Sequence, residues 1–135
     1  MRTYNIFISH SWTYGDHYDQ LCKMLSESPY FDHKDYSVPK DDPVHNASND
    51  SELKEAIKNK IKPSSAVLIM AGKYATYSKW INKEIDIAKK ELSKPIIAIT
   101  PWGAKQISTT VRDNADIVVG WNSSSIVQAI KEHCL

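Results

Sequence analysis

A run of six apolar residues, Ala66 to Ala71 (AVLIMA), constrains the fold of this chain most strongly. A strand with one face in water alternates apolar and polar residues, whereas an unbroken apolar run is typical of a strand buried on both faces. Such strands lie at the centre of parallel sheets that helices cover from both sides. We therefore expect an α/β protein with a central strand over residues 66–71.

Strand and helix patterns alternate along the rest of the chain. Tyr18, Leu21 and Leu25 recur at helical spacing, whereas residues 4–9 (YNIFIS) are rich in β-forming side chains. Further strands are expected at residues 36–38, 95–100 and 117–119, and helices at 16–27, between Asn49 and Pro63, at 78–92 and at 124–133. Five strands with intervening helices predict one domain over residues 1–135. Its expected architecture is a flavodoxin-like, doubly wound parallel sheet of order 2-1-3-4-5 with helices on both faces.

Turn-forming residues mark the boundaries between these elements. Residues 39–49 (PKDDPVHNASN) are predicted to form a loop. Asn49 is the better N-cap for the helix that follows, because Glu52 then occupies the partner position of a capping box. Ser78 is the expected N-cap of the helix at 78–92. Segment 101–116 is long enough to hold a helical turn of its own.

The charge balance argues against a nucleic-acid binder. Seventeen Lys and Arg against sixteen Asp and Glu leave a net charge of +1, too small for the broad positive surface that binds phosphate backbones. The four lysines between residues 54 and 62 share their stretch with Glu52 and Glu55, which favours a solvated helix face over a phosphate site.

Targeting signals and cysteine spacing favour a cytoplasmic protein. The N-terminal stretch is too short and polar for a secretory signal, and no apolar run approaches the ~20 residues that span a bilayer. Cys22 and Cys134 lie far apart with no metal-binding spacing, so we expect two free thiols in a reducing compartment. No contact with a membrane is expected.

Several common active-site motifs are absent. No GxGxxG follows the first strand, and the chain lacks the GxxxxGK[ST], HExxH and GxSxG signatures. Ser9-His10-Ser11 stands where the receiver domain of a response regulator would have acidic residues. We therefore expect neither a catalytic metal nor a resident cofactor.

Polar and aromatic residues gather instead at the predicted strand ends. Ligands of doubly wound sheets bind outside the carboxyl ends of the strands, where the strand order reverses. The loops after strands one and three, residues 10–15 and 72–78, frame that crevice. The candidate site residues there are His10, Ser11, Trp12, Asp42, Tyr77, Ser78, Trp80 and Glu84.

Trp80 and Glu84 are four residues apart and so share one face of a helix. An apolar ring can shield a carboxylate from water, and a carboxylate can stabilise a developing sugar cation. Other interpretations stay open at this point. Trp80 also fits the core, Glu84 also fits a solvated face beside lysines, and His10 also fits a backbone contact. Asp42, with the Asp before it, also fits a turn.

Taken together, these residues resemble a known family. The chain is similar to the TIR-like proteins of bacterial Thoeris anti-phage defence, and the resemblance covers nearly all of it. Typical TIR domains share an opening strand with F[IV]S and a helix with W-x-x-x-E, and both are present. The similar segments are 6–12 (IFISHSW), 35–45 (DYSVPKDDPVH), 71–88 (AGKYATYSKWINKEIDIA), 101–103 (PWG) and 117–122 (IVVGWN).

The resemblance implies an enzyme that cleaves NAD+ as its substrate. Such proteins convert NAD+ to nicotinamide and a cyclic ADP-ribose isomer, a diffusible nucleotide that switches on a separate effector. The family's catalytic glutamate maps onto Glu84, and its first-strand loop maps onto His10, Ser11 and Trp12. A homo-oligomeric state stays open. Two alternatives remain: a non-enzymatic TIR interaction module, and a nucleoside deoxyribosyltransferase-like enzyme, which also uses a glutamate on a sugar.

Overall fold

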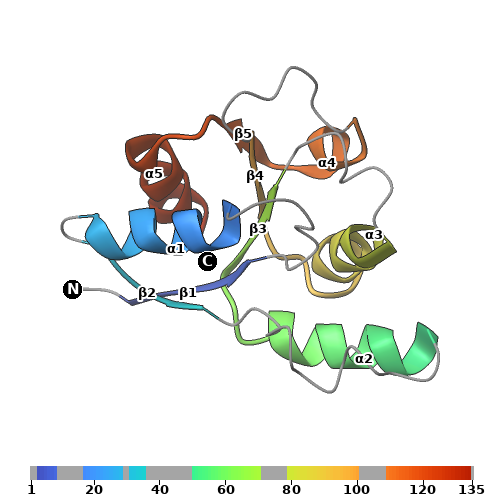
Figure 1. Ribbon diagram of the computed structural model, residues 1–135. Coiled ribbons are helices and arrows are strands. Elements are labelled where there is room, and N and C mark those ends of the chain that lie inside the picture. The colour runs from blue at the N-terminus through green and yellow to red at the C-terminus, as the bar shows by residue number, and fades with distance from the viewer. Residues whose placement is uncertain are drawn as a thin grey trace.

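The chain folds around a parallel sheet with strand order β2-β1-β3-β4-β5. The computed structural model describes residues 3–8, 17–28, 31–35, 50–70, 79–100 and 109–134. Its strands are β1 (Thr3–Ile8), β2 (Asp32–Asp35), β3 (Ala66–Met70), β4 (Ile96–Ile99) and β5 (Ile117–Val119). Its helices are α1 (His17–Glu27), α2 (Asp50–Ile61), α3 (Lys79–Asp86), the π-helical η3 (Ile87–Glu91), α4 (Thr109–Asn114) and α5 (Ser123–His133). The predicted flavodoxin-like architecture and strand order are confirmed (Figure 1).

β3 lies at the centre of the sheet, as its apolar sequence predicts. It pairs with β1 on one side and with β4 on the other. Residues 66–69 are completely buried because both faces of this strand are covered. The strand order reverses between β1 and β3, since the chain runs outward from β1 to β2 and then returns across β1.

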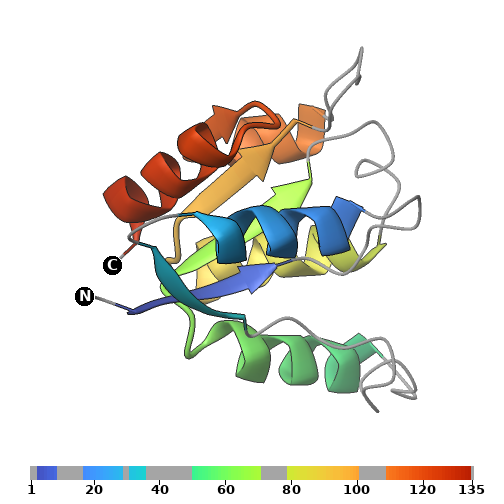
Figure 2. The same ribbon diagram turned by 60° about the vertical axis from the view of Figure 1, so that its left-hand side comes forward.

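Alternate residues of the strands feed two separate cores. Helices α2, α3, η3 and α4 cover one face of the sheet, and α1 and α5 cover the other (Figures 1 and 2). The core on the α2 side includes Phe7, Ile57 and Val67, and the core on the α1 side includes Ile6 and Leu21. Successive strand residues point to opposite faces of the sheet, and helices cover both faces, as in a doubly wound sheet.

The second strand begins earlier in the chain than predicted. β2 is formed by Asp32–Asp35 (DHKD), and residues 36–38, where the strand was expected, lie outside the described residues. DHKD carries no apolar pattern because β2 is an edge strand, where charged side chains are favoured. Backbone pairing with β1 defines it, and the Thr3 hydroxyl donates to Asp32 Oδ2 at 2.8 Å.

The long helix predicted at 78–92 also differs from expectation. It is α-helical only to Asp86 and continues as the π-helix η3, in which Leu92 N donates to Ile87 O at 2.9 Å. The remaining elements agree with prediction to within a residue or two at each end, and α4 is the helical turn expected within 101–116. The expected caps Asn49 and Ser78 lie outside the described residues.

Two further expectations concern the cysteines and the membrane. Cys22 and Cys134 are both free thiols, as expected, and both are half-buried. Among the described residues, no helix is both long and apolar enough to cross a bilayer.

Candidate functional site

Glu84 is the only charged residue that is buried in the described part of the chain. Its side chain is 1% exposed, and both carboxylate oxygens lie out of contact with water. The other buried polar residue, Ser64, donates its hydroxyl to Ile61 O at 2.6 Å, an ordinary contact at a helix end. Carboxylates are almost never fully buried without a specific reason. Glu84 therefore stands out on burial alone.

The helical position of Glu84 explains why it is buried. Ala88, one turn farther along, is fully buried, and Ile85 and Ile87 belong to the same core on the α2 side of the sheet. Glu84 thus lies on the face of α3 that packs toward the sheet. The interpretation of Glu84 as a solvated residue beside lysines is therefore wrong. Periodicity left that choice open because the helix has charged residues on both sides of Glu84.

α3 begins at the edge of the sheet where ligands of this fold bind. Parallel strands place their carboxyl ends together, and Ile8 pairs with Leu68 two residues before the end of β3. The chain therefore leaves β1 and β3 at the same edge, beside the reversal of strand order. Glu84 is the sixth residue of α3, about 7–8 Å along the helix axis from its first residue.

The other predicted site residues are placed only in part. Trp80 lies on α3 one turn before Glu84 and on the same face by helical geometry. The remaining candidates lie outside the described residues: His10, Ser11, Trp12, Asp42, Tyr77 and Ser78. The structure thus brings Trp80 and Glu84 onto one helix face. The roles of the other six stay predictions.

A second polar cluster lies at the end of the sheet where the strands begin, beside the first residues of β4 and β5. Asp116 Oδ2 accepts from Lys89 Nζ at 2.9 Å and from the amide of Ile96 at 2.7 Å. Partial burial by itself would raise the pKa of Asp116. The hydrogen bonds from Lys89 and Ile96, with the charges of Lys89 and His133, outweigh it and hold the pKa below its ordinary value. Sequence reasoning missed this cluster because its members are far apart in the chain.

Within the described residues, no group of three or more His, Cys, Asp and Glu side chains is placed to hold a metal ion.

Comparison with known proteins identifies the family. Residues 7–106 match the family model described as the Thoeris protein ThsB, TIR-like domain. The chain belongs to this family. The match covers more than half of the chain and includes β2, β3, β4 and the helix that carries Glu84. The protein is thus a TIR-like module of the kind used in defence and signalling, as the sequence resemblance predicts.

Solved structures support the same fold at low sequence identity. A prokaryotic SEFIR domain matches with a TM-score of 0.51 and 19% identity, covering 95% of this chain and 94% of that one. A putative pilus assembly-related protein of Burkholderia pseudomallei has a TM-score of 0.58 at 10% identity, with coverage of 98% and 92%. FerB, an NAD(P)H:(acceptor) oxidoreductase flavoenzyme of Paracoccus denitrificans, has a TM-score of 0.53 at 15% identity, covering both chains fully. No curated protein matches the chain at a significant level.

Proposed function

We propose that this ThsB-family chain cleaves NAD+ to nicotinamide and a cyclic ADP-ribose isomer, which signals to a separate effector in the cytoplasm. The observation that carries the proposal is the buried carboxylate of Glu84, on the helix that follows the central strand. An ionisable group kept out of water at the ligand-binding edge of such a sheet is a candidate for function. Family membership supports the choice of substrate.

The proposed reaction begins with cleavage of the bond between ribose C1′ and the nicotinamide nitrogen. The bonding electrons leave with nicotinamide, so C1′ acquires oxocarbenium character. Glu84 would accept hydrogen bonds from the ribose hydroxyls and offset that positive charge. Its burial matters because a charge acts more strongly where water does not screen it. A hydroxyl or ring nitrogen of the same molecule then attacks C1′ and loses a proton, which closes the ring; attack by water would give linear ADP-ribose.

Nicotinamide release by purified wild type, Glu84→Gln and Asp86→Asn tests the proposal. The amide keeps the shape of the glutamate but removes its charge, so we expect a loss of about 10²–10³-fold in Glu84→Gln. Asp86 is exposed on the same helix two residues away, so its variant should stay within twofold of wild type. Equal release by wild type and Glu84→Gln would refute the catalytic role.

Further experiments test the two alternatives, an interaction module and a deoxyribosyltransferase-like enzyme. Mass spectrometry of small molecules from phage-infected cells covers the case in which activity needs infection or self-assembly. If no cyclic isomer accumulates and Glu84→Gln still protects the cells, the chain is a non-enzymatic interaction module. If the purified protein exchanges bases on deoxynucleosides and leaves NAD+ intact, it is a deoxyribosyltransferase-like enzyme.

A further inference from the structure

The helix that carries Glu84 ends in an unusually wide turn. Leu92 N donates to Ile87 O at 2.9 Å, five residues back, and Lys94 N donates to Ala88 O at 2.7 Å. In a Schellman motif, the common end of an α-helix, Lys94 N would instead donate to the carbonyl oxygen of Lys89. Ser93 lies between them in the left-handed region, with φ of 52°. The end of the helix therefore holds one residue more than a straight α-helix would hold.

The extra residue decides which side chains face the core. A straight α-helix would turn Glu91 to within about 20° of the direction of Glu84, because seven residues make nearly two turns. A π turn of about 4.4 residues instead brings Leu92 to within roughly 10° of that direction and leaves Glu91 about 90° away. The structure agrees with this estimate: Leu92 packs against the core on the α2 side, whereas Glu91 is exposed.

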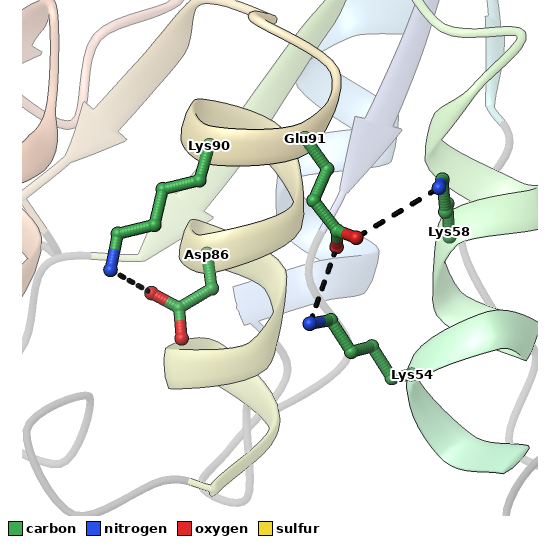
Figure 3. A network of polar contacts seen from close by, with 5 residues as sticks. All are labelled: Lys54, Lys58, Asp86, Lys90 and Glu91. Atoms are coloured by element: carbon green, nitrogen blue, oxygen red, sulfur yellow. Dashed lines mark ion pairs between the residues drawn. The ribbon is translucent and has the colours of Figure 1, made fainter. Parts of the chain in front are cut away.

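Because of this rotation, the side chain of Glu91 contacts α2. Its two carboxylate oxygens lie 3.6 Å from Lys54 Nζ and 3.8 Å from Lys58 Nζ (Figure 3). These lysines are one turn apart on α2, so a single carboxylate bridges both. The lysine cluster expected to be a solvated face thus makes contacts between helices with two of its members.

Lys89 makes an ionic contact on the other side of the helix. By the same geometry it points about 100° from Glu84 in the opposite sense to Glu91. There its ammonium group contacts Asp116 at 2.9 Å, and Asp116 is itself held by the amide of Ile96. Charged contacts therefore flank η3 on both sides, with Ile87 and Ala88 packed between them.

We infer that Lys89 and Glu91 are positioning residues, which fix the rotation of α3 about its axis and thereby the placement of the Glu84 carboxylate. The inference rests on the proposed function. Apolar packing beneath η3 holds the helix against the sheet, and the ionic contacts on its two opposite sides add resistance to rotation in both senses. A carboxylate about 5–6 Å from the helix axis moves about 1 Å for a 10° rotation. A displacement of that size is enough to reduce a rate by about 10²-fold.

The test compares two double variants of the same helix. Lys89→Met with Glu91→Gln removes both contacts to neighbouring elements. Asp86→Asn with Lys90→Met removes the same two charges from an exposed pair, 3.5 Å apart, within the helix itself (Figure 3). We expect kcat for nicotinamide release to fall about tenfold or more in the first variant, with KM within about twofold. The second variant should keep both values within about twofold of wild type.

Amide hydrogen exchange of residues 84–88 is the second readout, and it needs no catalysis. Exchange there should quicken about tenfold in the first double variant and stay unchanged in the second, with α5 as the internal reference. Reversing the ionic contact to α2, by Glu91→Lys with Lys54→Glu and Lys58→Glu, should leave kcat near the wild-type value.

Equal effects of the two double variants, or no change in either readout for the first, would overturn the inference. If the purified wild type releases no nicotinamide, hydrogen exchange alone decides whether Lys89 and Glu91 hold the helix, and the infected-cell experiment decides the proposed function.

Discussion

Replacing Glu84 by leucine should abolish the proposed activity and should leave the protein more stable than replacement by alanine does. Leucine and glutamate have similar volumes, so Glu84→Leu fills the same space on the sheet-facing side of α3. The change removes a carboxylate that is 1% exposed and whose oxygens have lost their contact with water. It leaves an apolar side chain among Ile85, Ile87 and Ala88, which are themselves buried.

The size of the effect follows from this burial. Leucine keeps this core position filled, whereas a smaller side chain leaves a cavity whose lining loses its packing contacts. For a chain of this length each kcal/mol raises the melting temperature by roughly 3–5 °C. Glu84→Ala is the matched control, because it removes the carboxylate but leaves a cavity. We expect Glu84→Ala to be about 2–5 kcal/mol less stable than Glu84→Leu, as for a large-to-small change in a core.

Urea unfolding at pH 7, followed by circular dichroism, measures these differences, and nicotinamide release measures activity. A stable but inactive Glu84→Leu would show that the carboxylate is kept for function rather than for stability. If Glu84→Leu is no more stable than Glu84→Ala, the side chain at this position does not fill a core site, and the reasoning from burial is refuted.

Three further predictions concern residues away from Glu84. The pKa of Asp116 lies below its ordinary value of 3.8, so the unfolded chain binds more protons at this residue than the folded chain does. The ionised Asp116 therefore contributes its full stability to the fold above pH 3.8, and that stability is lost as the pH falls below this value. Asp116→Asn should therefore show a smaller loss of stability between pH 5 and pH 3 than wild type in urea unfolding; an equal loss would contradict this. Asn122 caps α5 by accepting from Ser125 N at 3.1 Å, so Asn122→Ala should lose about 1 kcal/mol, and an unchanged melting temperature would count against the cap. Ser93 has a φ of 52°, so Ser93→Gly should gain about 0.5–1 kcal/mol in the same assay, and a loss would show that its side chain stabilises the turn.

Most of the architecture could be predicted from local patterns. The unbroken apolar run at residues 66–71 predicts the central strand, because a strand buried on both faces has no position for a polar side chain. β2 (DHKD) could not be predicted, because an edge strand gains its pairing from the backbone and tolerates charged side chains.

The candidate site, too, could be predicted from the sequence only in part. The spacing of Trp80 and Glu84 places both on one helix face, and the family resemblance makes Glu84 the candidate for catalysis. Neither could show that Glu84 is buried, because burial depends on which face of α3 packs against the sheet. The contacts of Lys89 and Glu91 were also beyond sequence reasoning, since they follow from a π turn and from partners on other elements.

The sequence by itself determined the order of elements, the doubly wound sheet and the helix that carries Glu84, because apolar periodicity is a local property. Only the tertiary structure decided that Glu84 is buried and that η3 gains one residue. The physical reason is that the rotation of a helix depends on its neighbours. Leu92 packs against the core while Glu91 contacts the lysines of α2, and a π turn is a backbone geometry that satisfies both.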